Sequence, residues 1–200
     1  MAELKLIKMS QIQPKPVEWL WELYIPIGAV SFIQGDGGLG KTTISLSIAA
    51  AVSTGTALPG EFITSPALVI VLNAEDSYKE TIRPRLDQLG ADNDMITVID
   101  DDYEPLTFMD NRIEAAIIRT NARLIICDPT QAFFGRANIN AAGSVRPIMK
   151  HLGKIAQRHR CAILLVGHLG KQAVKLHIVG LVVLIFSPPQ EACSLSVVSR

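Results

Sequence analysis

Apolar residues along this chain follow two spacings that alternate from one segment to the next. Predominantly apolar runs, typical of strands buried on both faces of a sheet, occupy residues 27–35, 67–73, 123–127 and 161–166. Apolar residues three or four positions apart, typical of amphipathic helices, occupy residues 41–54, 110–120 and 145–159. This alternation predicts strand–helix–strand units and therefore a parallel sheet.

Weaker patterns lie between these segments. Residues 77–89 are polar and helix-like, with Ser77 as the expected N-cap, and Pro84 is expected to disturb the middle of this helix. Residues 95–99 predict a short strand, and Asp110 is the expected N-cap of the helix that follows. The complete order predicts an α/β fold with a mainly parallel twisted sheet that is flanked by helices on both faces.

Composition narrows the class of protein. Lys and Arg number 19, as do Asp and Glu, so net charge gives no argument for a nucleic-acid partner. Hydrophobic residues make up 48% of the chain, which excludes a largely disordered protein. Cys127 and Cys161 lie in apolar runs, where we expect buried thiols. The N-terminus has no signal-peptide pattern and the apolar run at 178–186 is too short for a spanning helix, so we expect a cytoplasmic protein without a membrane segment.

The segment GDGGLGKTT matches the phosphate-binding motif G-x-x-x-x-G-K-[ST]. It follows a predicted strand and begins a predicted helix, so its backbone N–H groups and the positive end of the helix dipole are available to phosphate. The expected nucleotide-binding residues are Gly35, Asp36, Gly37, Gly38, Leu39, Gly40, Lys41, Thr42 and Thr43. We expect Lys41 to reach the β- and γ-phosphates of ATP, Thr42 to bind Mg²⁺ and Thr43 to contact the α-phosphate side.

Carboxylates follow two of the predicted strands. Asp128 ends RLIICD, the position of an aspartate that holds Mg²⁺ mostly through water, although an aspartate that caps a loop would give the same pattern by itself. Glu75 follows ALVIVLN, and because ligands bind outside the carboxyl ends of such strands, we expect it to face the γ-phosphate and to activate water. Asp76 is the alternative, and we prefer Glu75 because its longer side chain can reach across an intervening water.

His168 is the third polar group in this series, since it follows the apolar run CAILLV. A lone histidine is more often structural. Its position at a third strand end suggests instead that it hydrogen-bonds the γ-phosphate and senses the loss of this group. The predicted catalytic residues are therefore Glu75, Lys41 and His168, and the predicted metal ligands are Thr42 and Asp128.

Five stretches of the chain carry a family resemblance: VEWLWELYIP, IQGDGGLGKTT, VIVLNAEDSYKETIRPRL, LIICDPTQAFF and ANINAAGSVRPIMKHLGKIAQRHRCAILLVGHLGK. Together they resemble the RecA-like ATPases of the RepA/RadA type, which include AAA-domain ATPases of plasmids, prophages and other mobile elements. They cover most of residues 17–171 in the family's order. NAED and CDPTQAFF are more specific than the phosphate loop, because they separate this group from other P-loop proteins.

The resemblance implies a RecA-like P-loop NTPase fold, Mg²⁺-dependent ATP hydrolysis, a hexameric or related ring, and work on DNA in replication or repair. It also implies that Glu75 is the catalytic glutamate and His168 the γ-phosphate sensor. A helicase-type motor is the first expectation, and a nucleotide-responsive repair or loader accessory protein without helicase activity is the alternative. DNA as a partner rests on the resemblance alone. We divide the chain into a lead-in (1–24), a RecA-like ATPase core (25–174) and a tail (175–200).

The resemblance stops near Lys175, where the family continues with a segment similar to K-x-x-YRGLGSIDI-x-AAARSVL. Codons for residues 175–200 exist that, read from the third base of the first codon, spell ASYRGLGSIDIFAAARSVLTVGRQS. Only the first base of each shifted codon is then a wobble base, so there is little freedom to create such a match. We interpret the tail as the family's continuation read out of frame. The alternative is a divergent C-terminal strand at 178–186 that completes the sheet.

An out-of-frame tail has a mechanistic consequence. In this family the missing segment supplies an arginine that acts across the subunit boundary, and such an arginine is worth about 10³–10⁵ in rate in phosphoryl-transfer systems. We therefore expect ATP binding with poor turnover, together with impaired ring assembly.

Overall fold

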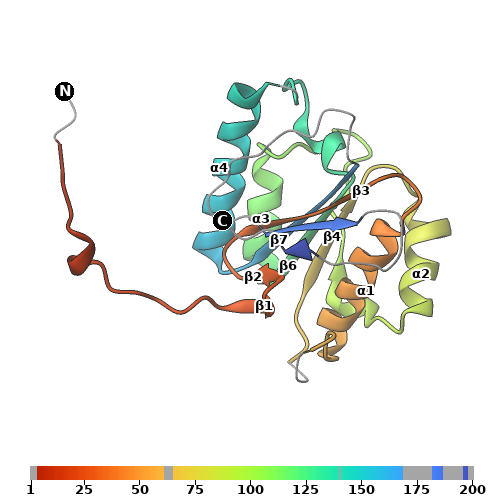
Figure 1. The fold of residues 1–200 in the computed structure, drawn as a ribbon. Helices are drawn as coiled ribbons and strands as arrows, with labels where there is room; N and C mark the ends of the chain where they lie inside the picture. Colours follow the sequence, from red (N-terminus) through yellow and green to blue (C-terminus); the bar gives the residue numbers. More distant parts are fainter. Residues whose placement is uncertain (1–3, 61–64, 140, 169–181, 187–195, 198–200) are drawn as a thin grey trace.

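The computed structural model describes residues 4–60, 65–139, 141–168, 182–186 and 196–197, and it consists of a twisted sheet between two layers of helices (Figure 1). The strands are β1 (Trp19–Trp21), β2 (Ile25–Pro26), β3 (Val30–Gly35), β4 (Val69–Asn73), β5 (Ile96–Thr97), β6 (Leu124–Asp128), β7 (Ala162–His168), β8 (Val182–Phe186) and β9 (Ser196–Val197). The α-helices are α1 (Lys41–Thr54), α2 (Arg83–Gln88), α3 (Asn111–Thr120) and α4 (Ala142–His159). Short helical turns are η1 (Met9–Gln11), η2 (Tyr78–Ile82), η3 (Asn93–Met95) and η4 (Thr130–Phe134).

The main sheet has the strand order β5-β4-β6-β7-β3-β8-β9. All pairings from β5 to β8 are parallel, and β9 runs antiparallel to β8. β1 and β2 form a separate antiparallel pair at the start of the core. The predicted α/β fold with a mainly parallel sheet is therefore confirmed.

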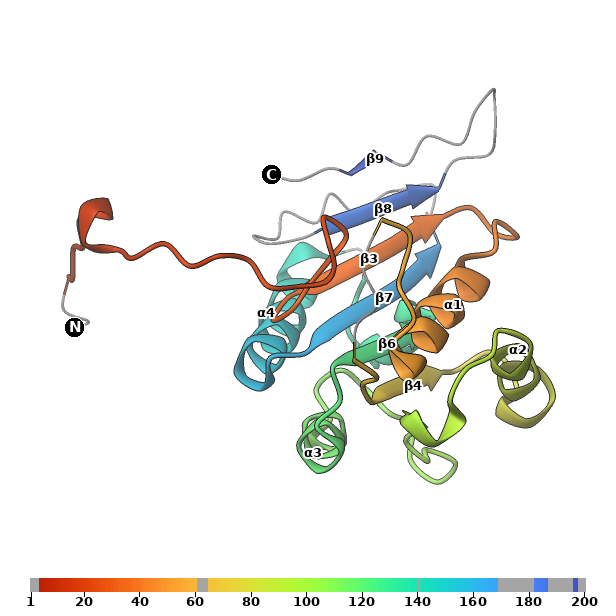
Figure 2. The same cartoon turned by 90° about the horizontal axis from the view of Figure 1, so that it is seen from below.

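Both faces of the sheet are covered, as the uniformly apolar strands predict. Along β4, Ile70 and Leu72 pack into the cluster that contains the apolar residues of α3 and α4, while Val69 and Val71 pack into the cluster of α1 and α2. Figure 2 shows α1 and α2 on one side of the sheet and α3 and α4 on the other. Successive side chains of a strand point to opposite faces, and here both faces are buried. Polar residues therefore cannot occupy every second position of these strands, and this explains their continuous apolar runs.

Residues 77–89 depart from the single helix that the pattern predicts. Ser77 is the N-cap as predicted, and its Oγ accepts a hydrogen bond from the Glu80 N–H at 3.2 Å. However, the first turn, η2, is π-helical, and the regular helix α2 begins at Arg83. Pro84 lies in the first turn of α2. Proline has no N–H to donate, so it fits at a helix start, and the break falls just before it.

Other local predictions hold with small shifts at the ends of elements. The side chain of Asp110 caps α3 by accepting the Arg112 N–H at 2.8 Å. The strand predicted at 95–99 is limited to β5, which pairs only with Val69 and Ile70. Cys127 and Cys161 are buried free thiols, and burial raises the pKa of Cys161 to about 11. Within the described residues, no helix has the length and hydropathy needed to cross a membrane.

One described segment of the tail, β8, lies parallel to β3. A strand at this place is what the second interpretation of the tail predicts. An apolar segment produced by a shifted frame would also cover an open sheet edge, since unpaired edge groups accept any strand-forming segment. The pairing of β8 is thus compatible with both interpretations, and the division of the chain at residue 174 stays a prediction.

Candidate nucleotide-binding site

The carboxyl ends of four parallel strands lie along one edge of the sheet. Asn73 at the end of β4 lies opposite Asp128 at the end of β6, and Gly35 at the end of β3 lies opposite His168 at the end of β7. β6 and β7 are paired in turn, which brings the two pairs of ends together. In Figure 2 the arrowheads of β3, β7 and β8 point to the same side of the molecule. The residues predicted for the site therefore converge, although the side chain of His168 lies outside the described part of the chain.

The phosphate loop connects β3 to α1 and depends on two glycines. Gly38 and Gly40 have φ of +78° and +74°, in the left-handed region where other residues are strained. A Cβ atom at Gly37, Gly38 or Gly40 would meet no atom of the described residues within 4 Å. Gly38 and Gly40 are thus required by backbone conformation, and the described residues leave the space beside the loop open.

Lys41 is the first residue of α1 and is only 5% exposed. Its Nζ donates a hydrogen bond to the carbonyl oxygen of Asp36 in the loop, at 2.6 Å. This bond holds the ammonium group against the loop, next to the start of α1. A buried cation and a helix N-terminus at one place form an anion-binding site.

Thr42 and Asp128 come from motifs 86 residues apart and meet beside the loop. The Oγ1 of Thr42 donates a hydrogen bond to Oδ2 of Asp128 at 2.6 Å. Asp128 is 7% exposed, so its carboxylate is held in place by its surroundings. Hydroxyl and carboxylate oxygens are ligands that Mg²⁺ prefers, and this ion is usually bound by one or two such groups together with substrate phosphates. The two residues therefore fit a magnesium ion at the phosphate loop.

The two candidate carboxylates after β4 have different surroundings. Asp76 forms an ion pair with Arg85, with 3.4 Å between Oδ2 and Nη1. Glu75 is exposed, and no residue in the described part of the chain forms an ion pair or a side-chain hydrogen bond with its carboxylate. Within this part of the chain, the carboxylate of Asp76 is therefore paired and that of Glu75 is not. The preference for Glu75 over Asp76, and its catalytic role, stay predictions.

Three residues that stabilise this end of the sheet were not predicted from the sequence. Asn73 Oδ1 accepts hydrogen bonds from the backbone N–H groups of both Glu75 and Asp76, at 3.0 and 2.7 Å. The Tyr78 hydroxyl bonds the backbone of Asn73. Thr130 Oγ1, in η4, donates to the Val166 carbonyl oxygen of β7 at 2.8 Å. Asn73 had a visible signal, because it is a polar residue at the end of an apolar strand.

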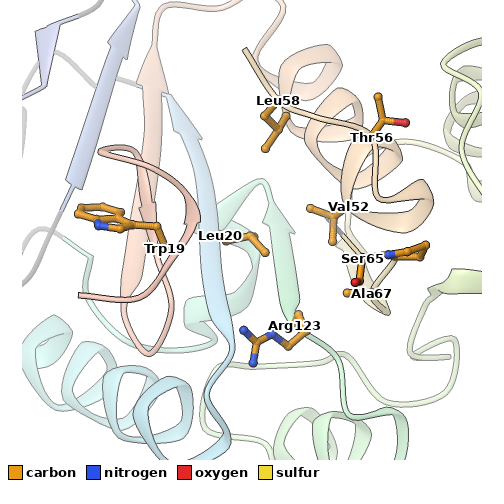
Figure 3. A pocket seen from close by; sticks show the side chains of 9 residues that line it. Trp19, Leu20, Val52, Thr56, Leu58, Ser65, Ala67 and Arg123 are labelled. Atoms are coloured by element: carbon orange, nitrogen blue, oxygen red, sulfur yellow. The ribbon is translucent and has the colours of Figure 1, made fainter. Parts of the chain in front are cut away.

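A cavity of about 400 Å³ lies elsewhere on the molecule (Figure 3). It is lined by Trp19, Leu20, Val52, Thr56, Leu58, Ser65, Pro66, Ala67 and Arg123. Ala67 and Arg123 precede β4 and β6, so the cavity is at the amino ends of these strands. No residue predicted for nucleotide binding lines it, and the cavity is therefore separate from the site at the carboxyl ends.

Known proteins resemble most of this chain. A family model described as AAA domain matches residues 3–174. The DNA repair protein RadA of Bacillus subtilis (strain 168) is 30% identical over 148 residues, which cover 72% of this chain and 29% of that protein. The DNA repair protein RadA of Halalkalibacterium halodurans is 29% identical over 149 residues, with the same two shares. The chain spans less than a third of the length of these curated relatives.

The Thr42–Asp128 hydrogen bond predicts a measurable contribution to stability without any ligand. The variant Thr42→Val loses this bond, and hydrogen bonds to charged groups contribute about 1.5–3 kcal/mol. We expect a loss of this size in the free energy of unfolding, measured by urea denaturation without nucleotide or Mg²⁺. Thr43→Val, at the exposed neighbouring position, is the control and is expected to change stability by less than about 0.5 kcal/mol. Equal losses in both variants would contradict a specific bond.

Proposed function

The chain belongs to the AAA domain family and has the fold of a RecA-like P-loop NTPase, and from this premise we propose that it binds ATP with Mg²⁺ and hydrolyses it in work on DNA during replication or repair. The observation that carries the proposal is the 2.6 Å hydrogen bond between Thr42 and Asp128 beside the phosphate loop. It unites the two motifs that phosphate binding and metal binding require, although each motif alone has another explanation.

Each group of residues at the site has a separate role in the proposed reaction. The backbone N–H groups of the loop and Lys41 bind the phosphates, and Thr42 and Asp128 would hold the metal. Mg²⁺, when bound, offsets the negative charge that phosphoryl transfer redistributes. Glu75 orients the attacking water and accepts its proton. His168 hydrogen-bonds the γ-phosphate and reports its loss.

DNA as the partner is supported by the charges of α4. Arg146, Lys150, Lys154 and Arg158 follow one another at intervals of four residues, and all four are exposed. The helix contains no Asp or Glu. Arg158 pairs with Glu114, while the other three have no ion-pair partner among the described residues.

This spacing places the basic side chains on the helix face opposite the one that is buried. The buried residues of α4 are Val145, Ile148, Met149, Leu152, Ile155 and Ala156. Like charges four residues apart destabilise a helix, so the arrangement favours an external polyanion as the counter-charge. The four residues span about 18 Å of helix, which suits the phosphate backbone of a nucleic acid.

The finer proposal is a motor of the RepA helicase type that works as a hexameric or related ring. The printed name of the two relatives, DNA repair protein RadA, favours a second candidate: a nucleotide-responsive repair or loader protein without helicase activity. Strand-displacement activity distinguishes the two.

We also propose that residues 175–200 are read out of frame. The AAA domain match ends at residue 174, immediately before the first codon from which the shifted reading spells the family's continuation. Under the same proposal, the apolar character of 178–186 is a by-product of the reading frame, because in the shifted frame the codons of this stretch spell part of YRGLGSIDIF.

Substitutions at Lys41 and Glu75 should separate binding from turnover. Lys41→Ala removes the cation of the loop, and loss of one partner of such a charge pair costs at least about 2 kcal/mol, so MgATP affinity should fall by roughly 30-fold or more. Glu75→Gln should retain affinity and lose about 10²–10⁴ in turnover. Calorimetry and phosphate release measure the two effects.

Lys79→Ala is the matched control for charge, since Lys79 is exposed in η2. Normal turnover in Glu75→Gln together with a loss in Asp76→Asn would transfer the role of general base to Asp76. ATP binding that survives Lys41→Ala would contradict the proposed nucleotide site.

The basic face of α4 predicts a change in the salt dependence of DNA binding. The double variant Lys150→Ala/Lys154→Ala removes two phosphate contacts, so the slope of log K against log salt for single-stranded DNA should become less steep by about 1.4. The control Lys79→Ala/Arg119→Ala removes equal charge from exposed positions of η2 and α3 and should leave the slope unchanged. Equal slopes in both double variants would contradict the proposed DNA surface.

The reading-frame proposal has two tests. The gene should contain a site near the Lys175 codon where a one- or two-base change restores the family's continuation, and its absence ends the idea. A chain with the restored frame should hydrolyse ATP up to about 10³–10⁵-fold faster than the 200-residue chain, at similar affinity. A restored chain whose new arginines are replaced by alanine is the control, and robust DNA-stimulated turnover by the 200-residue chain would contradict the proposal.

A further inference from the structure

Among the described residues, the last residue of β4 has no neighbouring strand on the side away from β6. β5 pairs only with Val69 and Ile70, so it ends before the ladder reaches Asn73. The N–H and C=O groups of one strand residue point to the same side, and those of Asn73 point away from β6. Asn73 is 8% exposed, and buried backbone groups without a partner are costly.

A tyrosine hydroxyl takes the place of the missing strand. The Tyr78 hydroxyl accepts the backbone N–H of Asn73 at 2.8 Å and donates to the carbonyl oxygen of Asn73 at 3.2 Å. Burial raises the pKa of Tyr78, so the phenol keeps the proton that it donates throughout the neutral range. A phenylalanine would fill the same space and leave both backbone groups unpaired.

The side chain of Asn73 in turn fixes the backbone of the residues that follow it. Its Oδ1 accepts the N–H groups of Glu75 and Asp76, which closes a tight turn directly after the strand. On the other side, the Ala74 N–H donates to the carbonyl oxygen of Asp128 at 3.1 Å. The turn is therefore held from two directions, by Tyr78 and by the strand that carries the predicted metal ligand.

The start of the following helix fixes the tyrosine itself. Ser77 caps η2 through the Glu80 N–H, and Tyr78 is the first residue of that turn. The chain thus reverses after the strand and returns the phenol ring to the strand end five residues earlier. Arg85 of α2 holds the Asp76 carboxylate, while Glu75 remains without such a partner among the described residues.

We propose that Tyr78 is a positioning residue for ATP hydrolysis, which acts through Asn73 to fix the direction in which Glu75 leaves the end of β4. The inference rests on the proposed function, because it requires Glu75 to be the group that activates water. The hydroxyl touches neither nucleotide nor water; it sets the backbone that carries Glu75. A misplacement of about 1 Å in a reacting group can cost about 10²-fold in rate, which gives this indirect contact a large effect.

The test is the variant Tyr78→Phe in the full chain, with two readouts. Hydrogen exchange at the Glu75 and Asp76 amides should become faster, because the turn loses its support. The kcat for ATP should fall by about 10–100-fold, while the Kd for MgATP should stay within about 2-fold, since the phosphate loop is not involved.

Two controls distinguish positioning from general loss of stability. Asp110→Ala removes the N-cap of α3, which accepts the Arg112 N–H, and leaves both Tyr78 bonds in place, so it should destabilise the chain and preserve kcat. Tyr103→Phe removes a hydroxyl from a residue that is 99% exposed and should change neither readout. If Tyr78→Phe does not fold, Asn73→Ala, which removes only the acceptor for Glu75 and Asp76, gives the same test.

The possible outcomes test the structural part of the inference, the positioning role of Tyr78 and the proposed function separately. Unchanged exchange at Glu75 and Asp76 in Tyr78→Phe would overturn the structural part of the inference. An unchanged kcat, or an equal fall in Asp110→Ala, would overturn the positioning role while the proposed function stands. Normal turnover in Glu75→Gln would overturn the inference, which requires Glu75 to activate water, and would leave ATP hydrolysis in place. ATP binding that survives Lys41→Ala would instead overturn the proposed function.

Discussion

The central strands β3, β4, β6 and β7 pair in parallel and are buried on both faces, and this constraint decides where polar groups can lie. Such strands have no exposed face, so polar groups can reach ligand only where the strands end. Among the described residues, the two buried charged side chains are Lys41 and Asp128, and both lie at the carboxyl edge of the sheet. Burying a charge is costly without compensation. Here Lys41 has the carbonyl oxygen of Asp36 in the phosphate loop, and Asp128 has the hydroxyl of Thr42 from a distant segment.

The same constraint explains how this edge is braced. Strand ladders provide hydrogen bonds only as far as the shorter strand extends, and β5 ends early. The backbone groups beyond it need other partners, and the side chains of Tyr78, Asn73 and Thr130 provide bonds of this kind at the ends of β4 and β7. Residues that contact no ligand therefore decide how accurately the ligand-binding groups are placed.

Much of the fold could be predicted because its signals are local. The phosphate loop, the cap at Asp110 and the buried strands depend on residues that are close in sequence, and all appear in the structure where the pattern predicts them. The π-helical turn before Pro84 was not predicted. A proline can break a helix in its middle, or it can lie in the first turn of a new helix. The structure has the second arrangement, in which Ile82 and Leu86 on either side of Pro84 pack against the core.

Spacing and residue type were sufficient to predict the fold class, the phosphate loop and the candidate ligands, Thr42 and Asp128 among them. The direct contacts between these groups came only from the folded chain. The contact between Thr42 and Asp128 joins segments 86 residues apart, and no local pattern specifies such a distance. Likewise, the ion pair between Asp76 and Arg85 joins the turn after β4 to α2, and it is seen only once the chain is folded. Both depend on how separate elements pack, and that is a property of the complete chain.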